Sequence, residues 1–571
     1  MVAILRLTLK TLPMKKILLA LALILSLIAP INAHAAIKAG ASCKKAGQIT
    51  TIAGKKFKCV KSGKKLIWNK EIAAIRPSSV TPVAPAAPAE PVAPAAPVAP
   101  TAPAIDPNKP KQGQSCPTNS QDVIGYDNSL KLVLLMCNQF DDRYFPRPDG
   151  DKIDQITGKV LLGPLGSMNQ STEYKIQSAS YAKPTSSVSL NSDLAPIAQC
   201  RIPDAGPNGD IPNNPQRHFT SGFPLYKERA LLNQNPTIQV VAVDFPDLQG
   251  KNAPKVDLGE VVSFVSSFFE RQATSEIKIN WSIPDSYFRL PKNVTDYGLG
   301  GEFFTNKNWS PDNSFAYARE AIRLADPGID FSGASIIALV VPPHTTRQQI
   351  GAFIAQSSEP GQEFKTDEKD IYNLLIMSGP SGNKAYELLN WAHETGHMFG
   401  LTDIRDTTDH TKQDSSDLGV FDLMNSMMAP ELLAWNRYML GILNDDQVRC
   451  VTKPEPTTHF LAPVAKRTTE PKMVVIPISK YKAVIIESRR NLGYDVNLGS
   501  ANEGAIVYTL DTTIPYRKST MKLVPSPSAT DTTWRRDAAL KLNESVSIWG
   551  YKITNIESGD FGDVVKVEKV G

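Results

Sequence analysis

The chain has 571 residues, of which 42% are hydrophobic and 21% are charged. This composition is typical of soluble globular proteins and excludes a multi-span membrane protein. The formal net charge is +5, but residues 36–71 contain ten lysines and one glutamate, and residues 1–35 contain four basic and no acidic residues. The rest of the chain is therefore mildly acidic, which argues against a nucleic-acid partner.

Residues 1–35 have the pattern of a signal peptide. Met14-Lys15-Lys16 precedes an apolar run at 17–28, and Ala33-His34-Ala35 supplies the small residues that a signal peptidase requires. The apolar run is short for a transmembrane helix. We expect cleavage after Ala35, export, and a secreted or cell-surface protein without a transmembrane segment.

Six cysteines follow the predicted cleavage site, and an even number in an oxidising compartment favours disulfides. The hexapeptide K-x-G-x-S-C occurs at 38–43 and again at 111–116. Each copy is followed by strand-like runs and a second cysteine, which predicts two small modules with one bridge each. The expected pairs are Cys43–Cys59 and Cys116–Cys137, and they leave Cys200 to pair with Cys450.

The N-terminal half divides by composition. Residues 36–70 form a small basic disulfide module with short strands expected at 48–52, 57–60 and 66–68. Its positive charge suits an anionic cell-envelope polymer, although a solvated face without a ligand is the alternative. Residues 77–110 contain eleven prolines and form a Pro/Ala-rich linker that favours polyproline II. A second small disulfide module is expected at 111–148, and an irregular extension or pro-segment at 149–199.

Residues 200–450 alternate between buried-strand and amphipathic-helix patterns, which predicts an α/β layer. Strands are expected at 237–245, 277–283 and 334–341, and helices at 256–273, 315–325 and 383–399. Residues 451–571 contain short β-rich runs at 473–478, 482–488, 505–511, 545–551 and 564–567. They predict an all-β domain, most simply a sandwich, so the fold class is α+β and multidomain.

The strongest chemical motif is His393-Glu394-Thr395-Gly396-His397 on the predicted helix 383–399. Histidines four apart leave one helix face one turn apart, which suits two ligand positions of a tetrahedral zinc ion. Glu394 is then placed to take a proton from a water on the metal.

Gly400 is expected to end the helix in a left-handed conformation and to return the chain, so that Asp403 becomes the third ligand. The fourth position stays open, as in catalytic rather than structural zinc sites. Glu431, on the next predicted helix, is the competing third ligand.

These residues resemble the metzincin-type zinc peptidases, and within them the immune inhibitor A-like metalloproteases. Phe421-Asp422-Leu423-Met424-Asn425 is similar to the family's Met-turn, with Met424 as the methionine beneath the metal. Segments 433–441, 243–247, 487–489 and 504–511 are similar to other parts of the family, so the resemblance spans about residues 235–570. It implies a zincin-like peptidase domain, with His393, His397 and Asp403 as metal ligands and Glu394 as the catalytic residue.

The sequence departs from the family at two places. Thr402 precedes Asp403 where the family commonly has proline, and no tyrosine directly follows the Met-turn. The residue that stabilises the oxyanion is therefore open, with His410 and Tyr438 as candidates. A loop histidine and a packed helix tyrosine are the structural alternatives.

Cys200 has a second possible role besides the disulfide with Cys450. Together with Pro203 and Asp204 it looks like the C-x-x-P-D cysteine switch of some metzincin zymogens. That reading competes with the Cys200–Cys450 bridge and would leave Cys450 unpaired.

We therefore expect a secreted zinc metalloendopeptidase acting on protein or peptide substrates. The alternatives are a non-catalytic binding or adhesion protein on a peptidase scaffold, and a zinc-dependent hydrolase of a non-peptide amide. The acidic stretch 406–417 could bind calcium but lacks EF-hand spacing, so a calcium site is not assignable. There is no G-x-S-x-G nucleophile elbow and no Gly-rich phosphate loop.

Overall fold

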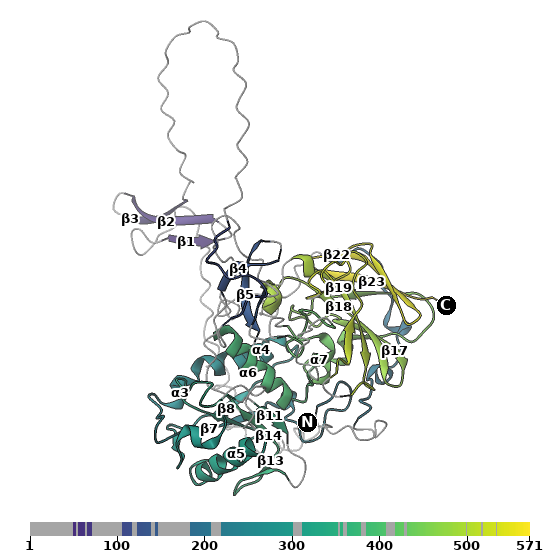
Figure 1. The fold of residues 1–571 in the computed structure, drawn as a ribbon. Helices are drawn as coiled ribbons and strands as arrows, with labels where there is room; N and C mark the ends of the chain where they lie inside the picture. The colour runs from purple at the N-terminus through teal and green to yellow at the C-terminus, as the bar shows by residue number, and fades with distance from the viewer. Residues whose placement is uncertain are drawn as a thin grey trace, which may run out of the picture. The chain divides into compact units, whose positions relative to one another are not determined.

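The structure is a computed structural model (Figure 1). It describes residues 49–52, 55–62, 65–70, 105–116, 123–128, 130–138, 143–146, 183–206, 219–300, 311–351, 354–357, 362–377, 384–406, 417–426, 431–497, 500–515, 518–532 and 534–570. The chain divides into two compact units, Met1–Ala99 and Pro100–Gly571.

The first unit contains one antiparallel sheet in the order β1 (Ile49–Ile52), β2 (Lys55–Ser62) and β3 (Lys65–Lys70). The three strands predicted in the basic module are thus confirmed. Cys59 is buried and disulfide-bonded. Its predicted partner, Cys43, lies outside the described residues, so that pairing stays a prediction.

A similar small sheet opens the second unit, in the order β4 (Val123–Tyr126), β5 (Leu132–Asn138) and β6 (Arg143–Pro146). Its small core includes Cys116 and Leu135. Cys116 is disulfide-bonded, but the side chain of Cys137 is not among those described. The Cys116–Cys137 bridge also stays a prediction.

A mixed six-stranded sheet forms the centre of residues 200–450. Its order is β11 (Ile354–Ser357), β14 (Asn373–Ile376), β10 (Ile336–Val340), β7 (Thr237–Asp244) and β8 (Asn280–Ser282), with β9 (Phe288–Arg289) also pairing with β7. The pairs are parallel except β11, which runs antiparallel to β14. A short hairpin, β12 (Phe364–Lys365) and β13 (Asp370–Ile371), lies apart from this sheet.

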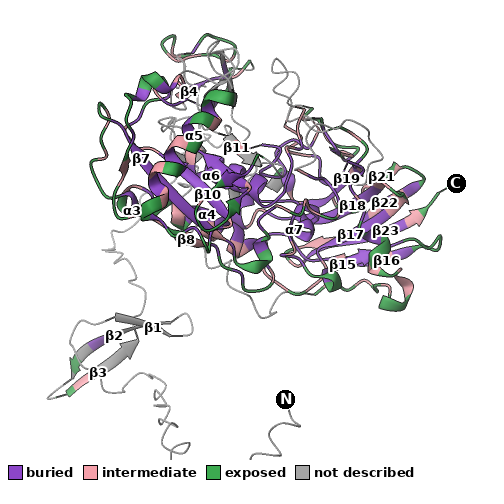
Figure 2. Ribbon diagram, turned by 90° about the horizontal axis from the view of Figure 1, so that it is seen from below, coloured by how far each residue is buried: buried purple, intermediate pink, exposed green. Residues whose placement is uncertain are grey.

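Helices cover both faces of the sheet. Because side chains alternate along a strand, Val240 of β7 packs with α4 (Gly259–Gln272) and α6 (Lys384–Met398), whereas Val241 packs with α5 (Pro311–Ala325). Figure 2 shows α6 as almost wholly buried. This layering confirms the predicted α/β arrangement and places the motif helix inside the core.

Residues 448–570 form two sheets that share one hydrophobic core, so the β region begins three residues before the predicted boundary at 451. The first has the order β15 (Val448–Cys450), β17 (Met473–Ser479), β18 (Lys482–Arg489), β19 (Gly504–Asp511) and β20 (Met521–Leu523). The second has the order β16 (Thr457–Leu461), β23 (Gly562–Lys569), β22 (Tyr551–Gly559) and β21 (Ser545–Ile548). The all-β character expected of this region is confirmed.

The α/β layer and the first of these two sheets share a continuous core. Met424 and Phe399 belong to the same buried cluster as Met473 and Tyr508. Cys200 and Cys450 form a disulfide across a sequence separation of 250 residues. That bridge was predicted and is confirmed, and the cysteine-switch alternative is wrong because the Cys200 sulfur is already bonded.

Several boundaries differ from the expected ones. The helix predicted at 256–273 is two helices, α3 (Pro254–Asp257) and α4, which meet at Leu258. The run 545–551 holds a hairpin turn, because Trp549 and Gly550 adopt positive φ angles of 48° and 81°. Two such residues match the twist of paired strands.

The helix after the Met-turn segment, α7 (Ala434–Met439), begins beyond Glu431, so placing Glu431 on a helix was wrong. Short 3-10 helices occupy Asn191–Asp193, Ile197–Cys200, Leu232–Gln234, Val294–Tyr297, Asp326–Gly328, Asp445–Gln447, Gly493–Asn497 and Ser500–Asn502. Within the described residues, no helix has the length and apolar character needed to cross a bilayer.

Candidate metal centre

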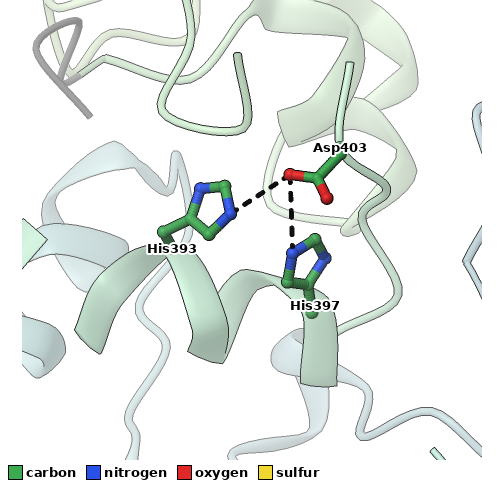
Figure 3. Close-up of side chains that lie close together, drawn as sticks. All are labelled: His393, His397 and Asp403. Atoms are coloured by element: carbon green, nitrogen blue, oxygen red, sulfur yellow. Dashed lines mark ion pairs between the residues drawn. The ribbon is translucent and has the colours of Figure 1, made fainter. Parts of the chain in front are cut away.

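Helix α6 presents His393 and His397 on one face. Both imidazoles point from the helix toward Asp403 (Figure 3). Their ring centroids lie 4.8 Å apart, and both side chains are buried. Leu388 and Ala392 anchor the helix in the main core. The apolar positions predicted from the sequence thus hold the two imidazoles in place.

The turn after α6 brings the third residue to the histidines. Gly400 has a φ of +107°, a conformation that favours glycine. Its N–H donates to the carbonyl of His397, and the N–H of Leu401 donates to that of Gly396, at 2.9 and 3.1 Å. These bonds end the helix as predicted and direct Asp403 back toward the imidazoles.

Three potential ligand atoms converge. Asp403 Oδ1 lies 3.3 Å from His393 Nε2 and 3.8 Å from His397 Nε2 (Figure 3). All three ligand atoms fall within 4.8 Å of one another. Ligands of a tetrahedral zinc ion are separated by roughly 3.4 Å, given zinc–ligand bonds of about 2.1 Å. The three residues can therefore hold a metal ion.

The hydrogen bonds of the imidazoles fix which nitrogen faces the site. His393 Nδ1 lies 2.9 Å from the carbonyl oxygen of Leu423, and His397 Nδ1 lies 2.8 Å from that of Leu401. A carbonyl only accepts, so each Nδ1 carries a hydrogen, and in the neutral form of the ring each Nε2 presents a lone pair to the site. Such contacts are the usual outer support of metal-binding histidines.

The carboxylate of Asp403 completes this set of electron-pair donors. Its buried Oδ1 accepts no hydrogen bond when His393 is neutral. The 3.3 Å contact with His393 Nε2 becomes a hydrogen bond only if that ring is doubly protonated. Burial opposes ionisation, but protonated His397 and His393 outweigh it and hold the pKa of Asp403 well below its usual range. With neutral imidazoles, a bound cation would supply this positive charge instead. Three donors that face one another without a proton between them fit a cation.

Glu394 lies beside the first histidine in a dry environment. It is buried, and this burial raises its pKa to about 7, against the opposing effect of His397. The backbone N–H of Ala355, in β11, donates to the carboxylate. A carboxylate with a pKa near neutrality can both accept and return a proton at physiological pH.

The predicted Met-turn segment, residues 421–425, packs under the motif helix. A Cβ atom on Gly396 would lie 2.9 Å from Met424 Sδ, so the missing side chain permits this close approach. The carbonyl of Leu423 holds His393, and the N–H of Ile404 donates to the carbonyl of Met424 at 3.1 Å. One segment thus supports His393 and the irregular segment that carries Asp403.

Asp422 fixes the shape of that segment. It is fully buried with a φ of +74°, and its carboxylate accepts hydrogen bonds from the N–H groups of Met424 and Leu433 at 2.7 and 2.6 Å. The sequence analysis did not assign Asp422 a role, because its bond to Leu433, eleven residues further along the chain, forms only when the two segments pack together.

The competing candidates lie elsewhere. Glu431 is buried, pairs with Arg437 and accepts the N–H of Tyr494 at 2.9 Å, so it is not part of the cluster. The hydroxyl of Tyr438 donates to Asp445 at 2.8 Å and accepts from Arg201 at 3.1 Å. His410 lies outside the described residues.

Arg405 is a charged group near the site that the sequence analysis missed. Its positive charge lowers the pKa of both Glu394 and Asp403, and its buried Nε donates to no acceptor. The signal was its spacing, two residues beyond Asp403, which favours the same side of an extended segment.

No protein-family model and no curated protein sequence matches this chain.

Proposed function

We propose that this chain is a secreted zinc metalloendopeptidase of the metzincin type. One observation carries the proposal: the two Nε2 atoms and Asp403 Oδ1 converge with their lone pairs facing one another, beside a buried glutamate. Two histidines and one carboxylate leave a coordination position for water or substrate, as in catalytic zinc sites. The Met-turn resemblance and the packing of Met424 against Gly396 favour the metzincin type.

A zinc ion held by His393, His397 and Asp403 would polarise the scissile carbonyl and make a water acidic near neutral pH. Glu394 accepts a proton from the attacking water and delivers it to the nitrogen of the leaving amine, so that one C–N bond breaks as one C–O bond forms. The positive charge of Arg405, which acts on both Glu394 and Asp403, would stabilise the developing oxyanion in place of the hydroxyl that the family's tyrosine provides.

A binding or adhesion protein on the same scaffold is the second candidate, favoured by the two N-terminal modules. A binding protein does not need a general base, so the buried Glu394 next to the first histidine favours the enzyme. Hydrolysis of a non-peptide amide would use the same groups and is separated by the choice of substrate.

A casein or gelatin zymogram of the purified chain tests the proposal. We expect a cleared band that a chelator abolishes and that added zinc restores, and no band from the Glu394→Gln variant. Proteolysis that survives chelation, or a Glu394→Gln variant as active as the wild type, would contradict it.

We also propose that the basic module, residues 36–70, binds an anionic cell-envelope polymer. Its ten lysines, with no acidic residue, attract polyanions in a salt-sensitive way. Removal of residues 36–110 should leave cleavage of soluble casein unchanged and abolish sedimentation with cell walls at low salt. Equal sedimentation of both forms would contradict the role.

A further inference from the structure

Arg229 is a buried cation without a partner. Its side chain is only 4% exposed, and Nε, Nη1 and Nη2 all lack a hydrogen-bond acceptor. Other buried arginines have hydrogen-bond acceptors. Arg437 pairs with Glu431, Arg489 with Glu487 and Asp495, and Arg490 with Asp563. Arg449 donates to Asn191 and to the carbonyl of Ser189. Arg229 differs from these arginines because none of its three guanidinium nitrogens has an acceptor.

The side chain of Arg229 lies next to the metal centre. Its Cγ packs 3.1 Å from the position a Cβ would take on Gly400, the glycine that ends the motif helix. The backbone around it is tied to that helix end, because the N–H of Ala230 donates to the carbonyl of Met398 and that of Thr220 to the carbonyl of Gly400.

Two aromatic rings cover the guanidinium. Its Cζ lies 5.7 Å from the ring centroid of Phe219 and 5.8 Å from that of Tyr226. The ring of Phe219 in turn lies 5.1 Å from that of His397, so one aromatic ring separates the cation from a metal ligand. Aromatic faces stabilise a cation but leave its N–H groups without acceptors.

The nearby charges do not neutralise Arg229. Burial lowers its pKa to about 9, and the charges of Tyr226 and Glu228 only partly oppose this. Glu228 forms its ion pair with Lys227, at 3.4 Å. An unpaired buried charge is costly, and a planar guanidinium is best satisfied by a carboxylate that accepts two parallel hydrogen bonds.

We propose that Arg229 binds a carboxylate of the substrate, so that the enzyme prefers peptides with an acidic side chain or a free C-terminal carboxylate near the scissile bond. This inference rests on the proposed peptidase function. Phe219 and Tyr226 are only partly buried, so the rings that cover the guanidinium reach the surface, and binding of a carboxylate requires one of them to move.

Peptide cleavage by the full-length chain tests the inference. Quenched fluorescent peptides are compared in pairs, with glutamate or glutamine at each position flanking the cut, and with a free or an amidated C-terminus. We expect kcat/KM to be about 10- to 100-fold higher for one acidic member, the range that a charged hydrogen bond provides. The pair that differs identifies the source of the carboxylate.

Arg229→Met should remove this preference by lowering kcat/KM for the acidic peptide alone. The matched control is Arg289→Met, since Arg289 is half-exposed and pairs with Asp244, and it should keep the preference. Arg229→Gln serves as a second variant if the methionine variant does not fold. Equal cleavage of acidic and neutral peptides by the wild type would overturn the inference without any variant.

A binding measurement separates this inference from the peptidase proposal. N-acetylglutamate α-amide, which carries only a side-chain carboxylate, and N-acetylglycine, which carries only a terminal one, are added during thermal unfolding. We expect one of them to raise the melting temperature of the wild type but not of Arg229→Met. That result without peptide cleavage would keep the anion site and refute the peptidase function, whereas an equal shift with chloride would overturn the carboxylate site.

Discussion

Glu394→Gln should make the protein less active and, after removal of metal by chelation, more stable. The carboxylate is buried and its pKa is raised to about 7 by that burial. Glutamine keeps the shape of the side chain and can still accept the N–H of Ala355, but it carries no charge at any pH. Loss of the base should lower turnover by about 10²- to 10⁴-fold.

The stability gain follows from the raised pKa. In the unfolded chain a glutamate has a pKa of about 4.5, so the difference of roughly 2.5 pH units corresponds to about 3 kcal/mol. Because the folded-state pKa is the higher one, ionisation opposes folding. The penalty is absent below about pH 4.5, grows between pH 4.5 and 7, and is complete above pH 7.

Urea unfolding of the chelated wild type and variant at pH 4.5, 6 and 8 measures this difference. We expect nearly equal unfolding free energies at pH 4.5 and an advantage of about 3 kcal/mol for the variant at pH 8. Glu387→Gln, in the first turn of the same helix, is the matched control and should show no such widening.

Two results would refute the reasoning. An advantage of equal size at all three pH values would show that glutamine improves packing rather than removing a charge. A variant less stable than the wild type at pH 8 would show that the carboxylate is well solvated or paired in the folded protein.

Asp403→Asn should lower zinc retention after dialysis, with an affinity loss of at least about 100-fold, since loss of a residue that only supports a metal ligand already costs about 10- to 100-fold. Metal analysis should find full zinc in the control variant Asp406→Asn. Full zinc in both variants would contradict the assignment of Asp403 as a ligand. Replacing Cys200 and Cys450 by alanine should reduce the unfolding free energy, measured in denaturant, by up to about 5 kcal/mol. The bridge spans 250 residues, so its loss gives the unfolded chain more conformational freedom. A loss below about 1 kcal/mol would show that the unfolded chain gains little freedom. Gly400→Ala should cost about 1–3 kcal/mol because of its φ of +107° and the neighbouring Arg229 side chain, and an unchanged melting temperature would count against the strained turn.

Much of the candidate metal centre could be predicted from the sequence because its geometry is local. Two histidines four apart share a helix face wherever the segment is helical, and Gly400 marks the end of that helix. Only six residues lie between Gly396 and Asp403, so the turn itself limits where the carboxylate can go. The same reasoning applies to β7, whose continuous apolar run identifies it as a central strand.

Other features depended on contacts between distant segments. The strand β14 has only four residues and no alternating pattern, so its place between β10 and β11 follows from pairing rather than propensity. From the sequence, Glu431 was a plausible metal ligand. In the structure it forms a buried ion pair with Arg437, away from the two histidines, and this excludes it as a ligand.

Arg229 carries no local signal at all, because an arginine in a loop segment is ordinarily solvated. Its burial against Gly400, and the position of Phe219 between it and His397, arise when residues 219–231 pack on a helix more than 150 positions further along the chain. Helix and turn geometry is set by neighbours a few residues apart and is therefore written in the sequence, whereas the environment of a charge is set by whatever the folded core brings around it.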